Sequence, residues 1–238
     1  MKVLIPMAGE GSRFAKEGYT FPKPLIDVQG KPMIQKVVEN LDFDCEYVFL
    51  VRKKHVEQYT GLIDTLDRIT NGKFQYVAVD GLTEGAACTA LLAEKYIDND
   101  EDLLIANSDQ YIEYEPENFH MLKNLTNVDS AVFTFNAVHP KWSFVKTNSR
   151  GFVTEVAEKK PISNIATCGI YWYRKGSDFV KYAKEMIEKD IRVNNEFYIA
   201  PVYNELINDG KTLIPFYVHQ MWGIGTPEDL KYFLENKR

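Results

Sequence analysis

Two glycines and two cations lie close together near the start of the chain. Gly9 and Gly11 follow directly after the apolar run 3–5. Arg13 is two residues further on, and Lys23 stands between two prolines. Because glycine lacks a Cβ, a glycine-rich loop can turn sharply and present several backbone N–H groups to one anion. Arginine and lysine add positive charge at the same place. This stretch therefore predicts a polyphosphate site.

The glycine pair alone is also typical of a tight turn. It is neither a Walker A loop nor a Rossmann fingerprint, because Phe14 stands where the third glycine of the fingerprint would be. The wider pattern is more specific and runs from an apolar strand through GEGSR at 9–13 and FPKPL at 21–25 to GKPMI at 30–34. This compound pattern resembles the N-terminal signature of the sugar-1-phosphate nucleotidylyltransferases, enzymes that make nucleotide-activated sugars.

The composition is that of one globular unit without a general basic surface. The chain has 238 residues, 45% of them hydrophobic, and a net charge of −6. This length suffices for one domain with a substantial core, and the negative charge disfavours nucleic acid as a partner. No run approaches the ~18 apolar residues that cross a bilayer, so we expect a cytoplasmic protein without a membrane partner. Cys45, Cys88 and Cys168 lie far apart among apolar residues, which predicts buried free thiols.

Apolar spacing in the first half of the chain alternates between strand and helix patterns. Continuous apolar runs predict buried strands, and apolar residues three or four apart predict helices. The predicted order is a strand at 3–5, a helix at 32–41, a strand at 46–51, a helix at 54–70, a strand at 74–79, a helix at 83–96 and a strand at 102–106. This alternation is typical of a parallel, doubly wound sheet.

The second half has a different pattern. It predicts a strand at 130–138, a hairpin of 143–146 and 152–156, a long strand at 165–174, a helix through Ile207, and a last helix that begins at Thr226 as N-cap and Pro227. The resemblance implies an α/β, Rossmann-like nucleotidyltransferase fold: a mixed, mostly parallel central sheet flanked by helices, with a small β-hairpin acceptor region. We expect a single domain, 1–238, with a nucleotide-binding half at 1–127 and an acceptor-binding half at 128–238.

Asp109 follows the predicted strand 102–106. Ligands of open α/β sheets bind beyond the carboxyl ends of the strands, so Asp109 falls in the same crevice as the glycine loop. A carboxylate oxygen suits Mg²⁺, which commonly takes one or two protein carboxylates and completes its shell with phosphates and water. An aspartate that stabilises a turn explains these residues too. The resemblance implies the metal role, because family members carry an acidic metal ligand at this strand end.

The segment 222–230 resembles the closing motif of the family with one departure. Gly223 stands where the family commonly carries its second metal-binding aspartate. Either Mg²⁺ is held by Asp109 with phosphates and water alone, or another side chain compensates. The sequence leaves this second ligand unassigned.

The resemblance also implies an acceptor site in the second half. Glu158 and Lys159 match a Glu-Lys-Pro segment that holds the sugar and its phosphate, although an extra lysine, Lys160, precedes the proline and leaves the choice of lysine open. Gly169 lies in a strand that resembles the one closing over the acceptor. Glu196 is a plausible acceptor for hydrogen bonds from hydroxyl groups, and an exposed glutamate at a helix N-terminus is the alternative.

The nucleotide is expected at the first loop and at the segment around residues 83–87. The backbone of Ala8, Gly9, Gly11 and Ser12 would meet the base, ribose and phosphates, and Glu84 and Gly85 belong to the second base-reading segment. A carboxylate accepts hydrogen bonds from an exocyclic amino group, so Glu84 and Asp80 favour CTP or GTP over UTP or dTTP. A solvent-facing Glu84 that caps its helix explains the residue equally well.

The reaction implied by the resemblance is attack of a phosphomonoester, such as a sugar 1-phosphate, on the α-phosphorus of a nucleoside triphosphate with release of pyrophosphate. This chemistry requires alignment and neutralisation of charge rather than a protein nucleophile. Lys23 would stabilise the α-phosphoryl group and Arg13 the departing pyrophosphate. The pathway implied is the synthesis of surface polysaccharide precursors.

Two other classes stay open. A glycosyltransferase also has a nucleotide-binding α/β domain but uses Asp-x-Asp where this chain has Asn107-Ser108-Asp109. A non-catalytic nucleotide-binding homologue is favoured by Gly223 and disfavoured by the presence of both Arg13 and Lys23. A homo-oligomer also stays open, because the family forms dimers and tetramers through varied surfaces.

Overall fold

The computed structural model describes residues 1–237. Its strands are β1 (Lys2–Met7), β2 (Asp27–Val28), β3 (Lys31–Pro32), β4 (Glu46–Arg52), β5 (Phe74–Val79), β6 (Leu103–Ala106), β7 (Gln110–Glu113), β8 (Ser130–Asn136), β9 (Ser143–Thr147), β10 (Val153–Glu158), β11 (Ile165–Tyr173), β12 (Leu213–Tyr217) and β13 (Gln220–Gly223). The helices are α1 (Ser12–Lys16), η1 (Lys23–Leu25), α2 (Met33–Leu41), α3 (Lys53–Gln58), α4 (Gly61–Thr70), α5 (Ala86–Leu91), α6 (Glu94–Ile97), α7 (Pro116–Lys123), α8 (Gly176–Glu188), α9 (Val202–Asn208) and α10 (Pro227–Asn236).

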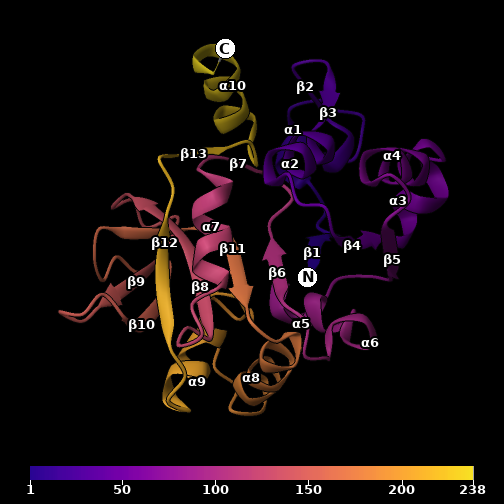
Figure 1. The fold of residues 1–238 in the computed structure, drawn as a ribbon. Helices are drawn as coiled ribbons and strands as arrows, with labels where there is room; N and C mark the ends of the chain where they lie inside the picture. The colour runs from indigo at the N-terminus through magenta and orange to yellow at the C-terminus, as the bar shows by residue number, and fades with distance from the viewer. Residues whose placement is uncertain (238) are drawn as a thin grey trace.

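A nine-stranded mixed sheet forms the centre of the molecule (Figure 1). Its main path runs β10-β9-β11-β6-β1-β4-β5, and β8 joins β11 to β12. The strands β6, β1, β4 and β5 are parallel to one another, whereas β11 runs antiparallel to β6 and β8. The predicted α/β fold with a mixed sheet is confirmed, and the parallel pairing is concentrated in the first half of the chain.

Buried apolar side chains cover both faces of this sheet. In β1, Val3 and Ile5 belong to the core cluster on one face, and Leu4 belongs to the cluster on the other. Successive side chains of a strand point to opposite faces, so a continuous apolar run is needed where both faces are covered. The short apolar runs of the sequence predicted the sheet for this reason.

Two predicted helices are each broken in the structure. The region 54–70 contains α3 and α4, because Tyr59 leaves the helical conformation and its hydroxyl donates to the carbonyl of Thr20 (3.0 Å). In the region 83–96 the helix begins only at Ala86, because the backbone of Gly85 is non-helical and packs against Phe197. Apolar spacing carries no information about either of these distant contacts.

The last helix begins as predicted. Thr226 is the N-cap of α10, and its side-chain oxygen accepts a hydrogen bond from the backbone N–H of Asp229 (3.1 Å). Pro227 occupies the first helical position.

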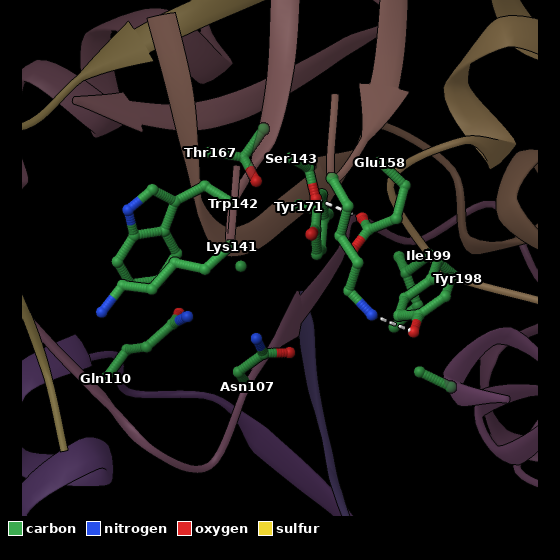
Figure 2. Close-up of a pocket in the computed structure, with 13 residues that line it drawn as sticks. Asn107, Gln110, Lys141, Trp142, Ser143, Glu158, Thr167, Tyr171, Tyr198 and Ile199 are labelled. Atoms are coloured by element: carbon green, nitrogen blue, oxygen red, sulfur yellow. Dashed lines mark hydrogen bonds between the residues drawn. The ribbon is translucent and has the colours of Figure 1, made fainter. Parts of the chain in front are cut away.

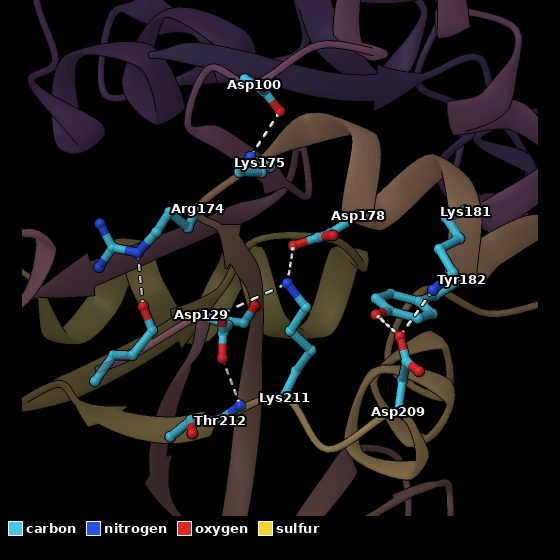
Figure 3. Close-up of polar contacts among 12 residues, drawn as sticks. Asp100, Asp129, Arg174, Lys175, Asp178, Lys181, Tyr182, Asp209, Lys211 and Thr212 are labelled. Carbon is cyan, nitrogen blue, oxygen red and sulfur yellow. Dashed lines mark hydrogen bonds and ion pairs between the residues drawn. The ribbon is translucent and has the colours of Figure 1, made fainter. Parts of the chain in front are cut away.

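Polar contacts tie α8 to the segments that precede β8 and β12, as Figure 3 shows. Lys211 lies between Asp129 and Asp178, at 3.6 and 3.4 Å. The carboxylate of Asp129 also accepts from the backbone N–H of Thr212 (2.8 Å), next to the start of β12. These contacts fix where β12 enters beside β8.

The three cysteines are free thiols, as expected, but only Cys168 is fully buried, and Cys45 and Cys88 are partly exposed. Burial raises the pKa of the Cys45 thiol to about 11, so this thiol stays protonated at neutral pH. Within the described residues, no helix combines the length and the apolar character that a membrane span requires.

Replacing Gly176 by Ala is expected to destabilise the fold strongly. A Cβ at this position, the first of α8, would lie 1.9 Å from the carbonyl oxygen of Ile97, which is backbone and cannot move alone. We expect a loss of about 3 kcal/mol in the free energy of unfolding, measured by urea denaturation. Gly61→Ala is the matched control, because a Cβ at Gly61 meets nothing within 4 Å. Equal stability of the two variants would contradict the packing argument.

Candidate active site

The glycine loop after β1 lies against Lys23. Gly11 has a left-handed backbone with a φ of 64°, and a Cβ there would lie 3.3 Å from the Cβ of Lys23. Lys23 is the first residue of η1 and is held between Pro22 and Pro24. The close approach therefore requires glycine at position 11 both for its backbone conformation and for space.

Lys23 and Asp109 form an ion pair. Asp109 follows β6, which is the parallel neighbour of β1, so the carboxyl ends of the two strands bring the aspartate to the glycine loop. Both side chains are mostly shielded, with 22% of Lys23 and 23% of Asp109 exposed. They line what we call the loop cavity, about 220 Å³ in volume, together with Pro6, Met7, Gly9, Pro24, Asn107 and Ser108.

The segment between β13 and α10 packs directly on Asp109. The backbone N–H of Ile224 donates to the carbonyl of Asp109 (3.0 Å). A Cβ at Gly225 would lie 2.4 Å from the Asp109 carboxylate. The nearest atoms to a Cβ at Gly223 belong to Asp229, whose carboxylate oxygen lies at 3.3 Å. Asp229 is therefore the carboxylate closest to the place that a side chain at position 223 would occupy. Its other carboxylate oxygen pairs with Lys141.

A second cavity, the hairpin cavity, lies where β9 and β10 meet β11 (Figure 2). Figure 2 shows Trp142 and Lys141 on one side of it, and Glu158 and Tyr198 on the other. Its volume is about 300 Å³, and its lining residues are Ala86, Asn107, Gln110, Lys141, Trp142, Ser143, Glu158, Lys159, Thr167, Gly169, Tyr171, Tyr198 and Ile199. Asn107 lines both this cavity and the loop cavity, so the two are neighbours.

Three of the four residues predicted for the acceptor line the hairpin cavity: Glu158, Lys159 and Gly169. The Lys159 side chain contacts the hydroxyl of Tyr198. Both lysines are exposed, and Lys160 is not among the lining residues. Of the two adjacent lysines, the geometry brings Lys159 to the cavity. Its backbone is left-handed, with a φ of 54°.

Gly169 is packed too closely for any side chain. A Cβ there would lie 2.3 Å from the Asn107 amide nitrogen and 2.6 Å from the Gln110 amide oxygen. That Gln110 oxygen is buried and has no hydrogen-bond partner among residues 1–237. A buried acceptor without a partner is costly, so a donor on a bound ligand would satisfy it.

Burial raises the pKa of Glu158, and the hydrogen bond from Ser143 together with the charge of Lys159 opposes this rise. The ionised form accepts hydrogen bonds from hydroxyl groups, and it is lost as the pH falls through the raised pKa. If Glu158 holds the acceptor, kcat/KM for the acceptor should begin to fall at a pH above the ordinary glutamate pKa.

Replacing Glu158 by Gln should remove this acid limb and weaken the acceptor by about 10- to 100-fold, the loss expected for one charge-assisted hydrogen bond. The measurement is kcat/KM for the acceptor as a function of pH. Glu155→Gln is the control, because Glu155 is exposed on the same strand. An unchanged acid limb in Glu158→Gln would exclude Glu158 as its origin.

A third cavity, the Gly85 cavity, lies beside the glycine loop. It measures about 260 Å³ and is lined by Pro6, Ala8, Gly9, Val79, Gly81, Leu82, Thr83, Gly85, Ala86, Thr89 and Glu196. It shares Gly9 with the loop cavity and Ala86 with the hairpin cavity. The three cavities therefore lie next to one another.

The structure separates some predicted residues from the positions assigned to them. The carboxylate of Glu84 pairs with Arg192 (2.7 Å) and does not line the Gly85 cavity, and the N-cap of α5 is Gly85 rather than Glu84. Asp80 is exposed and lies 3.9 Å from Lys53. Glu196 lines the Gly85 cavity instead of the hairpin cavity.

At Gly85 the segment 83–87 packs against the region around Phe197. A Cβ at Gly85 would lie 2.5 Å from the backbone nitrogen and from the backbone oxygen of Phe197. Two backbone hydrogen bonds cross this contact. The N–H of Phe197 donates to the carbonyl of Glu84 (2.8 Å), and the N–H of Ala87 donates to the carbonyl of Phe197 (2.9 Å). This contact places Glu196 at the Gly85 cavity.

The Asp109 carboxylate fits a divalent cation whose remaining ligands come from the substrate and water. The described residues contain no cluster of three or more histidine, cysteine, aspartate or glutamate side chains with metal-binding geometry. One shielded carboxylate next to a phosphate-sized cavity agrees with Mg²⁺, which retains water and phosphate ligands. Without substrate, the Lys23 ammonium is the cation that pairs with Asp109.

Comparisons with known proteins agree with this geometry. The family model described as nucleotidyl transferase matches residues 2–235. The chain belongs to the nucleotidyl transferase family. Its relatives include the bifunctional protein GlmU of Methanocaldococcus jannaschii, which is 26% identical over 99% of this chain and 55% of that protein. The low-salt glycan biosynthesis nucleotidyltransferase Agl11 of Haloferax volcanii is 25% identical over 97% of this chain and 64% of that protein.

Among solved structures, the nucleoside-diphosphate-sugar pyrophosphorylase of Vibrio cholerae RC9 is similar to this nucleotidyl transferase with a TM-score of 0.81. It is 25% identical, and the match covers 98% of this chain and 100% of that one. The expected membership in the sugar-1-phosphate nucleotidyltransferases and the expected Rossmann-like fold are confirmed. This chain spans about half the length of the first curated relative, 55% of it.

Several lining residues could not be assigned from the sequence. Ser143 and Tyr198 surround Glu158 and Lys159, and Lys141 and Gln110 lie across from them. These residues are separated by up to 88 positions along the chain. Trp142 also lines this cavity.

Proposed function

We propose that this chain transfers a nucleoside monophosphate from a nucleoside triphosphate to a sugar 1-phosphate, giving an NDP-sugar and pyrophosphate. The observation that carries the proposal is the Lys23–Asp109 pair, which lies in the loop cavity, next to both the Gly85 and hairpin cavities. A cation and a metal-ligating carboxylate at the junction of two ligand cavities are what phosphoryl transfer between two bound substrates requires.

In this reaction an oxygen of the acceptor phosphate forms a bond to the α-phosphorus, and the bond from that phosphorus to the β-phosphate oxygen breaks. Lys23 stabilises negative charge on the α-phosphoryl group. Glu158 and Lys159 hold the acceptor in the hairpin cavity, with Lys159 on its phosphate. The backbone of Ala8, Gly9 and Gly11 lies along the nucleotide, and Gly85 borders the base.

We propose that Mg²⁺ is the metal and that Asp109 is its protein ligand. When bound, it supplies neutralisation of the crowded phosphate charge. The close packing of Gly225 on Asp109 supports this role, because it holds the carboxylate in one place.

The structure pairs the carboxylates that bear on base preference with basic side chains. The carboxylates that favoured CTP or GTP, Glu84 and Asp80, pair with Arg192 and Lys53. Thr83, Thr89 and Glu196 line the Gly85 cavity and offer side-chain hydrogen-bonding groups there. CTP or GTP therefore stays a prediction from the sequence alone.

The deciding experiment measures pyrophosphate release from CTP, GTP, UTP, dTTP and ATP with Mg²⁺ against a panel of sugar 1-phosphates and other phosphomonoesters. Release that needs both substrates supports the transferase and names its base and acceptor together. Release from none of the pairs, with triphosphate binding still measurable by calorimetry, supports the non-catalytic homologue. The name of the Haloferax volcanii relative supports a role in glycan precursor synthesis.

A further inference from the structure

Tyr198 lies where the hairpin cavity and the Gly85 cavity adjoin, and the proposed function gives it no role. Its side chain lines the hairpin cavity, and Glu196, two residues earlier, lines the Gly85 cavity. Phe197 between them is buried and packs on the backbone of Gly85. Ala86 lines both cavities. The Tyr198 hydroxyl therefore lies close to the residues that hold the two substrates.

Lys159 is the side chain that this hydroxyl contacts. It is exposed and forms no ion pair within residues 1–237, whereas Lys141, the other lysine of the hairpin cavity, pairs with Asp229 (3.0 Å). The ammonium group of Lys159 donates to the hydroxyl oxygen of Tyr198 and lies 4.4 Å from the centre of its ring (Figure 2). A lysine side chain has many rotamers, so a contact that selects one of them determines where its charge lies.

The backbone of Lys159 is fixed as well. Lys159 follows the last residue of β10 and has a left-handed conformation with a φ of 54°. Its N–H donates to the carbonyl of Trp142 (3.0 Å). Residues other than glycine adopt this conformation at a cost, and such residues cluster at ligand sites. The bond to Trp142 fixes the start of the lysine side chain, and Tyr198 fixes its end.

The segment that carries Tyr198 is held by its own backbone. Asn194 and Asn195 are both left-handed, with φ angles of 49° and 63°. Val193 and Glu196, on either side of them, exchange two backbone hydrogen bonds of 3.0 Å each. Asparagine tolerates the left-handed region better than most residues. Tyr198 is therefore the fixed partner of the contact, and the lysine side chain is the adjustable one.

The hydroxyl of Tyr198 is needed for this contact in its protonated form. Burial raises the pKa of Tyr198, the hydrogen bond from Lys159 lowers it, and Glu196 raises it. The group stays protonated at neutral pH, because the net shift is upward. A phenylalanine would keep the ring but would offer no oxygen to the ammonium group. The other ionisable groups of the hairpin cavity are Lys141, Glu158 and Tyr171.

We propose that Tyr198 is a positioning residue that holds the ammonium group of Lys159 at the wall of the hairpin cavity, where this group meets the phosphate of the acceptor. The inference rests on the proposed function, which places that phosphate on Lys159. An ammonium group has three protons, so one can bind Tyr198 while the others bind the phosphate. Tyr198 acts through Lys159 and does not contact the reacting atoms.

The first test compares Tyr198→Phe with Tyr217→Phe. Tyr217 is the matched control, because it is 60% exposed on β12 and lines none of the three cavities. With the best acceptor of the pyrophosphate-release panel, Tyr198→Phe should raise KM for the acceptor about 10-fold and change kcat by less than about threefold. KM for the triphosphate and the melting temperature should stay unchanged, and the control should match the unmodified protein in every parameter.

The second test asks whether the effect passes through Lys159. In a double-mutant cycle, Tyr198→Phe should change KM for the acceptor by less than about twofold when Lys159 is already replaced by Ala. The same 10-fold effect in both backgrounds would show that Tyr198 acts on the acceptor by itself, and would overturn the positioning role.

NMR of the lysine ammonium groups in protein labelled with ¹⁵N-lysine gives a readout that needs no turnover. The signal of Lys159 is identified by its loss in Lys159→Arg. It should show slow exchange with water in the unmodified protein and in Tyr217→Phe, and should disappear through fast exchange in Tyr198→Phe. Retention of this signal in Tyr198→Phe would overturn the inference.

The outcomes keep this inference apart from the proposed function. Turnover with an unchanged KM for the acceptor in Tyr198→Phe overturns the positioning role and leaves the transferase in place. Absence of turnover with every substrate pair counts against the proposed function, and the NMR result then decides alone whether Tyr198 orders Lys159.

Discussion

Replacing Lys23 by Ala should lower kcat by about 10³-fold while triphosphate binding is retained within about 10-fold. Lys23 is the shielded cation of the loop cavity, and its ammonium group already lies on the Asp109 carboxylate. In the transition state the same group faces the negative charge that grows on the α-phosphoryl group. Removing one such preorganised group typically costs 10² to 10³ in kcat, and more where phosphoryl charge is concerned.

The Lys23 measurement is single-turnover pyrophosphate release under saturating Mg²⁺. Lys16→Ala is the matched control, because Lys16 is exposed on α1 and does not line the loop cavity. Lys23→Arg should recover part of the rate, because the planar guanidinium group restores the charge but not the compact shape of the ammonium group. Retention of full kcat in Lys23→Ala would remove Lys23 from the chemical step.

Replacing Gly225 by Ala should lower kcat by about 10²-fold and raise the Mg²⁺ concentration needed for half-maximal rate. The new Cβ would lie 2.4 Å from the Asp109 carboxylate oxygen, and the side chain must move because contacts below 3.0 Å do not occur. Asp109 is a flexible side chain, so its displacement should leave the melting temperature nearly unchanged. A shift of about 1 Å at a reacting group is enough for a loss of this size.

Gly223→Ala is the matched variant for this prediction. Its Cβ would lie 3.3 Å from the Asp229 carboxylate, which needs to give way by only a few tenths of an ångström. Its kcat and Mg²⁺ requirement should stay close to those of the unmodified protein. Equal Mg²⁺ requirements in Gly225→Ala and the unmodified protein would show that the position of Asp109 does not determine metal binding.

Local features of the sequence determined the elements that carry the loop. The apolar run at 3–5 forms β1, and Thr226 caps α10. Each depends on backbone preferences or hydrogen bonds within a few residues, so the sequence alone predicts it. The order of strands and helices in the first half then predicted that Lys23 and Asp109 would meet at one sheet edge, as they do.

Only the tertiary structure decided which side chains face each cavity. Glu84 lies close to the glycine of its own segment, yet its carboxylate turns to Arg192, a residue 108 positions away. Glu196 was expected at the acceptor, and the packing of the Phe197 region against Gly85 brings it to the Gly85 cavity instead. The direction of a side chain at the end of a strand depends on partners that pairing brings from elsewhere in the chain, and residue spacing carries no record of those partners.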